Sequence, residues 1–316
     1  DYIINKGDIV FISSRGGRNE NTIVVSRGIK FSKVKKGASI KINDGRIQLK
    51  VEKKESPTLL KCITSIGGKI ETGKGVNLPG ITLNLPALTM QDRKDIKLAI
   101  AETERLSEIP ECAAINLPDP GSSQKWSDPQ FNPFWETLSR LNMAASFHGG
   151  GSQTRWLRGY TETPGLASVS HAIAFPLDGM LSMGTLIFGN VLENFPELRC
   201  SFLEGNAGWA PWWLARMDDH AIGRQGRFQY EKKVQMDPSD YFKRQCFIAC
   251  DADERTLPFA ANQLGDNLIF NTDWPHPDAP IPGAVDMFLD QDFSDEIKKV
   301  ILWDNSVSLY GDRILN

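Results

Sequence analysis

A carboxylate, an imidazole and a second carboxylate fall within one short loop, at Asp273, His276 and Asp278. The loop follows the apolar run 267–270, which has the composition of a short buried strand, and two prolines stiffen it. Acid and imidazole groups on a rigid loop at the carboxyl end of a strand suit a metal site or a proton-transfer site. The same residues also fit a polar turn with a capping Asp and a surface His.

Three other apolar runs also end in a polar side chain, at His148, Glu204 and Asp251. If these runs are parallel strands of one barrel, their polar ends and Asp273 face a single mouth. For His148 we favour a ligand role over a turn residue. Glu204 fits equally well as an acid at the N-terminus of a helix. For Asp251 we favour the N-cap of the following helix.

Strand candidates and helical stretches alternate along the C-terminal part of the chain, from about residue 109. This alternation predicts a parallel sheet, in a barrel or a doubly wound fold. The predicted strands cover residues 112–117, 143–147, 198–203, 246–250 and 267–270, and the predicted helices cover residues 132–142, 180–195, 212–220, 256–264 and 295–303.

A different pattern fills residues 1–86, which we interpret as a separate small domain ahead of a second domain at 87–316. Short runs with period-two alternation and intervening turn signals predict a small antiparallel β-barrel. The sequence Asn43-Asp44-Gly45 predicts a hairpin between two of these runs. The predicted strands cover residues 8–12, 22–26, 39–43, 46–51 and 59–64.

The charge distribution also separates two parts of the chain. Residues 1–108 carry 20 Lys and Arg against 12 Asp and Glu, and residues 109–316 carry 16 against 27. No aromatic residues are interleaved with the basic runs, so we expect a solvated basic face and not a nucleic-acid site, with a phosphate-bearing ligand as the alternative. No apolar run approaches ~18 residues, so we expect no membrane span. The five cysteines form no C-x-x-C pair, which favours a reduced, cytoplasmic protein.

The N-terminal part resembles the mobile lid domain of pyruvate kinase. The resemblance lies in residues 33–51, in the segment Gly73-Lys-Gly-Val-Asn-Leu-Pro-Gly80 and in residues 85–96. It implies a small barrel that closes over a nucleotide, with Asp44 near the metal and nucleotide as a cofactor-binding residue. The catalytic Lys and the acidic metal ligands of that family have no counterpart after residue 108, and phosphoryl transfer needs such groups.

The C-terminal two-thirds resembles the amidohydrolase-related family, which includes aminocarboxymuconate semialdehyde decarboxylase. The motifs that carry this resemblance are Asp128–Trp135, Ser146–Gly149, Phe195–Arg199, Leu203–Trp209, Thr272–Asp278 and Asp304–Gly311. The resemblance implies a (β/α)8 barrel, of which the chain supplies strands four to eight.

The same resemblance assigns residues to a site. It implies a divalent metal, zinc or else manganese, bound by His148 and Asp273, with Asp273 also accepting a proton from water. Glu204 stands where the family usually has a His, and His171, in the loop after strand five, contacts substrate. The pair of ligands that the family places on strand one is missing, since residues 1–108 contain no His.

Together these observations predict a metal-dependent hydrolase or decarboxylase, a carbon–carbon lyase, that acts on a small carboxylated or cyclic substrate. A pyruvate-kinase-like phosphotransferase is one alternative. Another is a chimeric, non-catalytic chain in which both sites are incomplete. A barrel that lacks three strands exposes sheet edges, which favours association with another chain, including a homo-oligomer.

Overall fold

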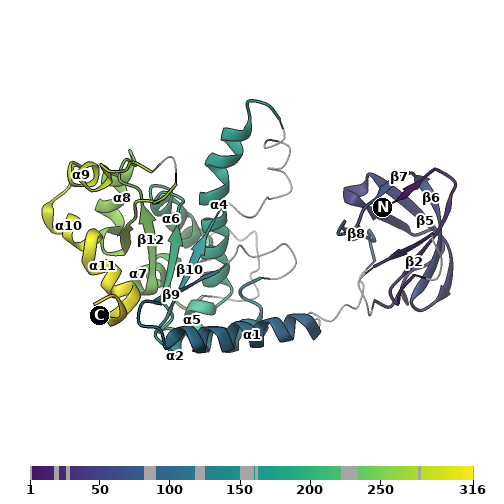
Figure 1. The fold of residues 1–316 in the computed structure, drawn as a ribbon, viewed down its shortest axis with the longest axis horizontal. Helices are drawn as coiled ribbons and strands as arrows, with labels where there is room; N and C mark the ends of the chain where they lie inside the picture. Colours follow the sequence, from purple (N-terminus) through teal and green to yellow (C-terminus); the bar gives the residue numbers. More distant parts are fainter. Residues whose placement is uncertain are drawn as a thin grey trace. The chain divides into compact units, whose positions relative to one another are not determined.

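The computed structural model (Figure 1) describes residues 2–17, 21–25, 29–81, 90–117, 125–149, 160, 163–221, 234–276 and 279–315. It divides into two compact units, Asp1–Thr89 and Met90–Asn316. The sequence places this division between residues 86 and 87. Each unit has its own hydrophobic core, and we describe each by itself.

Short β-strands build the first unit. Its six-stranded sheet has the order β3-β2-β6-β5-β4-β8, and β1 pairs with β7 in a separate ribbon. Neighbouring strands are antiparallel, except that β2 and β3 are parallel. The strands are β1 (Tyr2–Ile4), β2 (Ile9–Ser13), β3 (Thr22–Val24), β4 (Ser39–Ile42), β5 (Ile47–Ser56), β6 (Leu59–Ile66), β7 (Gly68–Ile70) and β8 (Val76–Asn77). The predicted small β-domain is therefore confirmed.

The hairpin predicted at residues 43–45 joins β4 to β5. The turn is a single 3-10 turn, η1 (Asn43–Gly45), and the strands on either side pair antiparallel. Asn43 has a φ of 49° and Gly45 a φ of 87°, which explains why a residue tolerant of the left-handed region stands at each position. Asp44 lies in this turn, and its side chain is outside the described part of the structure.

A parallel sheet organises the second unit. Its strands are β9 (Ala114–Leu117), β10 (Ala144–His148), β11 (Cys200–Leu203), β12 (Cys246–Cys250) and β13 (Leu268–Phe270). They pair in chain order, each strand parallel to the next. Sequential order in a curled sheet is the arrangement of consecutive barrel strands, whereas a doubly wound sheet changes direction at a switch point. The prediction of five consecutive strands of a (β/α)8-type barrel is confirmed.

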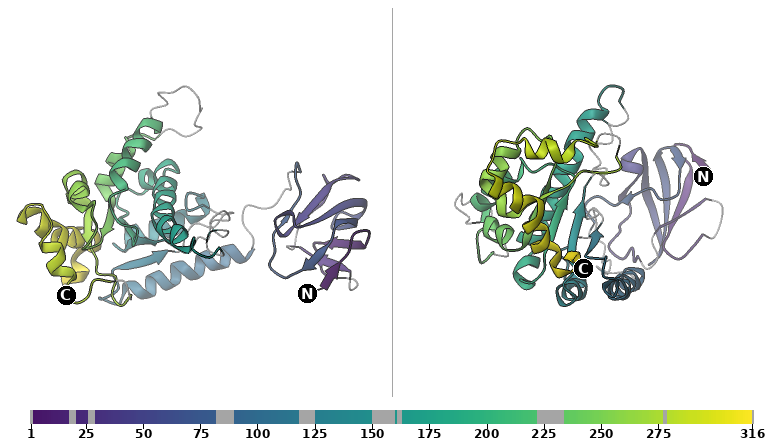
Figure 2. Two further views of the ribbon diagram at one scale, coloured as in Figure 1. Left: turned by 90° about the horizontal axis from the view of Figure 1, so that it is seen from above. Right: turned by 60° about the vertical axis from the view of Figure 1, so that its left-hand side comes forward.

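Helices alternate with these strands and pack along the curled sheet (Figure 2). Three of them have a proline in the first turn, where the missing N–H would have no partner within the helix. A fourth, which begins at Asp295, is capped by Ser294, whose Oγ accepts a hydrogen bond from Ile297 N. The helices are α1 (Met90–Ser107), α2 (Asn132–Arg140), α4 (Ala167–Phe188), α5 (Val191–Asn194), α6 (Ala210–Ala221), α7 (Pro238–Gln245), α8 (Leu257–Leu264), α9 (Ala284–Leu289), α10 (Asp295–Lys299) and α11 (Asn305–Tyr310).

The helix predicted at residues 180–195 differs from the observed one. It begins at Ala167, continues through Pro176 and ends at Phe188, where Gly189 and the left-handed Asn190 separate it from α5. His171 therefore lies in α4 and not in a loop, so that part of the sequence prediction was wrong. The N-cap role of Asp251 was also wrong, because α8 begins at Leu257 and its N-cap residue is Thr256.

Helix α4 is long and apolar enough, by length and composition alone, to cross a membrane. The sequence analysis expected no membrane span, because polar residues interrupt the apolar run. The C-terminal half of α4 packs inside the unit, where Met183, Leu186 and Ile187 are buried in the main core. These contacts are those of a helix that covers a sheet.

Candidate functional site

The carboxyl ends of four neighbouring strands carry the polar side chains of the site. His148 is the last residue of β10, and Glu204, Asp251 and Asn271 directly follow β11, β12 and β13. Parallel strands place their carboxyl ends at the same edge, so side chains from distant parts of the chain meet there. The strands themselves are apolar and buried, which fixes the positions from which these groups project.

Two of the acids are held in an unfavourable backbone conformation. Glu204 and Asp273 both have a φ of 54°, and Asn206 has a φ of 55°. Residues other than glycine, Asn and Asp rarely adopt this left-handed region, and doing so costs on the order of 1 kcal/mol or more. The energetic cost is greatest for Glu204, because only the shorter side chains of Asn and Asp can form local hydrogen bonds that offset it. Such strain, after two strands of the same sheet, β11 and β13, is typical of a functional site.

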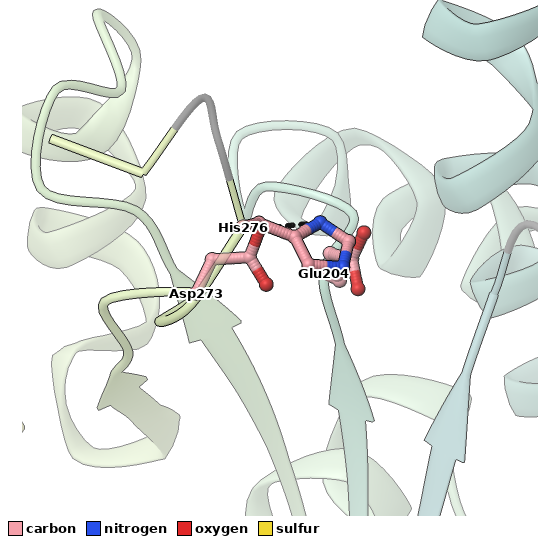
Figure 3. Close-up of side chains that lie close together, drawn as sticks. All are labelled: Glu204, Asp273 and His276. Carbon is pink, nitrogen blue, oxygen red and sulfur yellow. Dashed lines mark ion pairs between the residues drawn. The ribbon is translucent and has the colours of Figure 1, made fainter.

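Three donor groups meet at this edge (Figure 3). Glu204, Asp273 and His276 each offer one ligand atom, and these atoms lie within 4.8 Å of one another. His276 Nδ1 lies 3.2 Å from Asp273 Oδ2. The side chains of Glu204 and Asp273 are largely buried, with 19% and 28% exposed, whereas that of His276 is 57% exposed. The cluster therefore opens to solvent on the side of the imidazole.

His148 reaches the same cluster through Glu204. Its Nε2 forms an ion pair with Glu204 Oε2, and its Nδ1 lies 2.9 Å from the Gly149 carbonyl oxygen. A carbonyl oxygen accepts hydrogen bonds only, so Nδ1 carries a proton and Nε2 is the nitrogen presented to the acid. There is no room for a side chain at Gly149, because a Cβ at this position would lie 2.8 Å from the Phe175 carbonyl oxygen.

A cavity of about 340 Å³ is lined by two members of the cluster, Glu204 and Asp273. This volume is within the range of small-molecule sites and would hold a single-ring ligand. His171 and Phe175 of α4 form one wall, and Glu204 and Asp273 form part of the floor. The remaining lining residues are Ala172, Pro176, Gly205, Asn206, Asp251, Ala252, Asp253, Asn271, Thr272, Ala279 and Pro280.

Asp251 is an acid of this cavity that is held by two amides. Asn206 Nδ2 donates to Asp251 Oδ2 at 2.7 Å, and Asn271 Nδ2 donates to Asp251 Oδ1 at 2.9 Å. Burial raises the pKa of Asp251 to about 6; the hydrogen bond from Asn271 opposes this shift, and the nearby carboxylates add to it. A carboxyl group with this pKa exchanges protons near neutral pH.

Glu254 anchors the loop that carries Glu204. It is 7% exposed, and its carboxylate accepts from the backbone N–H of Ala207 at 2.8 Å and of Gly208 at 2.6 Å. Thr256 Oγ1 donates to the same carboxylate at 2.6 Å. A buried carboxylate with three donors fixes the turn after β11, and with it the direction of Glu204.

The structure brings together most of the residues named from the sequence. Glu204 and Asp273 lie in the donor cluster, His148 contacts Glu204, and His171 lines the cavity. His276, which the sequence analysis placed in the same loop as Asp273, proves to be a third donor, and Asp278 lies outside the described residues. Sequence reasoning missed Glu254 altogether, since its partners are backbone groups that no side-chain pattern reveals.

The donor set fits a divalent cation. Two carboxylates and an imidazole are ligands that zinc and manganese accept, and a further imidazole nitrogen, that of His148, faces Glu204. Four carboxylates line the cavity, and no Lys or Arg is among its described lining residues. A bound cation would offset this negative charge, whose accumulation in a partly buried site is otherwise unfavourable.

Comparison with known families matches the two parts of the chain to two different families. Residues 77–311 match the family described as amidohydrolase, and residues 1–106 match the family described as pyruvate kinase, barrel domain. Pyruvate kinase 1 of Trypanosoma brucei brucei is 38% identical over 69 residues, 22% of this chain and 14% of that protein. The pyruvate kinase of Methanocaldococcus jannaschii is 35% identical over 82 residues, 25% of this chain and 18% of that protein. The chain thus spans less than a fifth of the length of these relatives.

Several solved structures with a similar fold are described as decarboxylases, and others are described as amidohydrolases. The 5-carboxyvanillate decarboxylase of Sphingomonas paucimobilis superimposes with a TM-score of 0.57 at 19% identity, covering 69% of this chain and 64% of that one. The 2,6-dihydroxybenzoate decarboxylase of Rhizobium gives 0.56 at 19%, covering 69% and 68%. A dihydroxybenzoic acid decarboxylase of Polaromonas, with bound manganese and an inhibitor, gives 0.51 at 21%, covering 69% and 66%. These likenesses establish the fold of the second unit.

Proposed function

The chain belongs to the amidohydrolase family, and we propose that its second unit is a divalent-metal-dependent decarboxylase for small aromatic carboxylates. The observation that carries the proposal is the cluster of Glu204, Asp273 and His276, whose two carboxylates line a cavity of about 340 Å³. Manganese is our first choice of cation, because a structure with this fold contains it. Zinc is the alternative that the ligand types equally allow.

The charge of the cavity supports a metal-assisted reaction on an acidic substrate. An aromatic carboxylate is an anion, and a cavity lined by Glu204, Asp251, Asp253 and Asp273 repels it. Glu204, Asp273 and His276 would hold a divalent cation whose two positive charges would offset part of this negative charge and would attract the substrate carboxylate. The chemistry that the metal supplies when bound is Lewis-acid polarisation of the substrate oxygens.

Residues of the chain provide the remaining requirements. Loss of carbon dioxide breaks a carbon–carbon bond, and the ring carbon must receive a proton in its place. Asp251, with a pKa raised to about 6, is one acid that can carry this proton, and Asp273 is the other. His171 and Phe175 form an edge of the cavity against which an aromatic ring can pack.

The free cysteines of the chain support a cytoplasmic location. All five cysteines are free thiols, and four of them are buried. Free thiols persist where glutathione keeps them reduced, whereas secreted proteins tend to oxidise them in pairs. We therefore propose that the enzyme works in the cytoplasm.

Metal content tests the proposal directly. The full chain, stripped with a chelator and then incubated with Mn²⁺ or Zn²⁺, should retain about one equivalent after gel filtration, as measured by mass spectrometry of the metal. Asp273→Asn should lose most of it. Asp266→Asn is the matched control, because this exposed acid lies just before β13, at the strand's other end.

Product analysis tests the reaction class. The metal-loaded chain should convert 2,6-dihydroxybenzoate or 5-carboxyvanillate to the product lacking one carboxyl group, and chelation should stop the reaction. A chain that retains no metal, or that retains it equally in Asp273→Asn, contradicts the proposed site. A chain that binds metal at this site but turns over neither compound contradicts the substrate class.

A further inference from the structure

An apolar groove runs along the free side of β9, at the opposite end of the sheet from β13. It has a volume of about 390 Å³ and lies between α1 and β9, which run alongside one another in Figure 2. From α1 it is lined by the face that carries Ile96, Ala99 and Leu106. The rest of its wall consists of residues Asp95, Glu102, Thr103, Ile115, Asn116, Leu117, Trp126, Phe131 and Phe134.

Strand β9 has no partner strand on the groove side among the described residues. Among the described strands β9 pairs only with β10, so it is an edge of the sheet. Ala144 N donates to Ala113 O on the β10 side. Because successive residues of a strand point their N–H and C=O groups to opposite sides, Ala114 and Asn116 direct theirs away from β10 and towards the groove. An edge with free donors and acceptors next to apolar side chains is a template for strand pairing.

A second donor at the groove also lacks an acceptor. The indole Nε1 of Trp126 is buried and has no hydrogen-bond partner within the described part of the chain. Trp126 lines the groove, and its ring packs against Phe131 and Trp135. A buried N–H without an acceptor is unfavourable, so an occupant that brings a carbonyl oxygen would be favoured at this position.

We propose that this groove receives an extended strand from another polypeptide, which pairs with β9 and places alternate apolar side chains against α1. The Ala114 carbonyl oxygen accepts from Cys112 Sγ at 4.0 Å. The N–H groups of Ala114 and Asn116 and the C=O group of Asn116 pair with no other described strand, and they call for a peptide backbone, which a small apolar molecule does not provide. This site is independent of the proposed metal centre.

A synthetic peptide serves as the probe. It alternates valine and threonine between terminal lysines, and a matched peptide is N-methylated at its threonines, which keeps the apolar side chains but removes ladder donors. Binding to the ¹⁵N-labelled full chain is followed by NMR, and exchange protection is measured at the amides of Ala114 and Asn116. The proposal predicts saturable binding of the first peptide, protection at both amides, and binding of the methylated peptide about tenfold weaker.

Two chain variants separate the groove from the rest of α1. Ile96→Lys places a charge in the groove and should abolish binding, whereas Leu98→Lys, at a position 69% exposed on the same helix, should leave it unchanged. Tryptophan fluorescence shows whether each variant is folded, and the methylated peptide tests the proposal on the unaltered chain. Failure of the first peptide to bind overturns the proposal. Equal binding of both peptides overturns it in favour of an apolar-ligand site. A dimer of the free chain that Ile96→Lys dissociates overturns it in favour of a second copy.

Discussion

The anchor at Glu254 gives a sharp prediction about how the site is held. In Glu254→Gln the side chain keeps its volume, but one of its two oxygens becomes an amide group that donates and does not accept. Oε1 accepts from Gly208 N and Thr256 Oγ1, and Oε2 accepts from Ala207 N. The amide oxygen can satisfy the first two donors, which leaves the N–H of Ala207 facing another donor in a buried position.

The structure sets the size of this effect. An unsatisfied buried N–H costs about 1–3 kcal/mol, and replacing two charge-assisted hydrogen bonds by neutral ones removes about 1 kcal/mol more. We therefore expect Glu254→Gln to lower the free energy of unfolding of the second unit by about 3 kcal/mol. For a unit of this size the corresponding fall in Tm is about 6–12 °C.

Thermal unfolding followed by tryptophan fluorescence measures this quantity on the full chain. All eight tryptophans lie after residue 125, so the signal reports on the second unit alone. Glu197→Gln is the control, since this acid is exposed, and it should stay within about 0.5 kcal/mol of wild type. A Glu254→Gln protein as stable as this control would refute the anchoring role.

Three further predictions concern protonation, thiol reactivity and packing. Because the pKa of Asp251 is raised to about 6 in the folded protein, the folded state binds this proton more tightly than the unfolded state does. The free energy of unfolding of the second unit should therefore fall as pH rises from about 4 to 6. Asp251→Asn should remove that dependence in urea titrations followed by fluorescence. Cys112 is half-buried and the other four thiols are buried, and burial raises the pKa of Cys62 to about 12. A maleimide at pH 8 should therefore label Cys112 alone in the native chain, and it should label no thiol in Cys112→Ser. Labelling of Cys62 would contradict this prediction. Gly208→Ala should destabilise by about 2–3 kcal/mol, because its Cβ would lie 1.9 Å from Thr256 Oγ1, whereas Gly265→Ala, with 3.7 Å to its nearest neighbour, should be mild; equal denaturation midpoints for the two variants would show that the loop adapts.

Much of the second unit could be predicted from local patterns. Apolar runs such as 246–250 are buried on both faces of a parallel sheet and are therefore continuously hydrophobic, which makes the strand and its polar end at Asp251 visible in the sequence. Consecutive strands separated by helices then predict a barrel edge where these ends meet.

Other features depend on contacts between distant segments. The start of α4 could not be found from the sequence because Pro176 usually interrupts a helix, whereas here the helix continues through it, and His171 was misplaced for this reason. The two amides that hold Asp251 come from Asn206 and Asn271, which are 45 and 20 residues away. Neither partner follows from spacing along the chain, so Asp251 was interpreted as a local cap.

We propose that Glu204, Asp273 and His276 together hold a divalent cation. The metal-free chain is titrated with Mn²⁺, and the free ion is followed by its electron paramagnetic resonance signal. This titration gives the number of bound ions and their dissociation constant without any assumption about the reaction. We predict one saturable site in wild type and in Asp266→Asn, and its loss in both Glu204→Gln and Asp273→Asn. Undiminished free-ion signal in wild type, or an equal affinity in either cluster variant, would contradict the account.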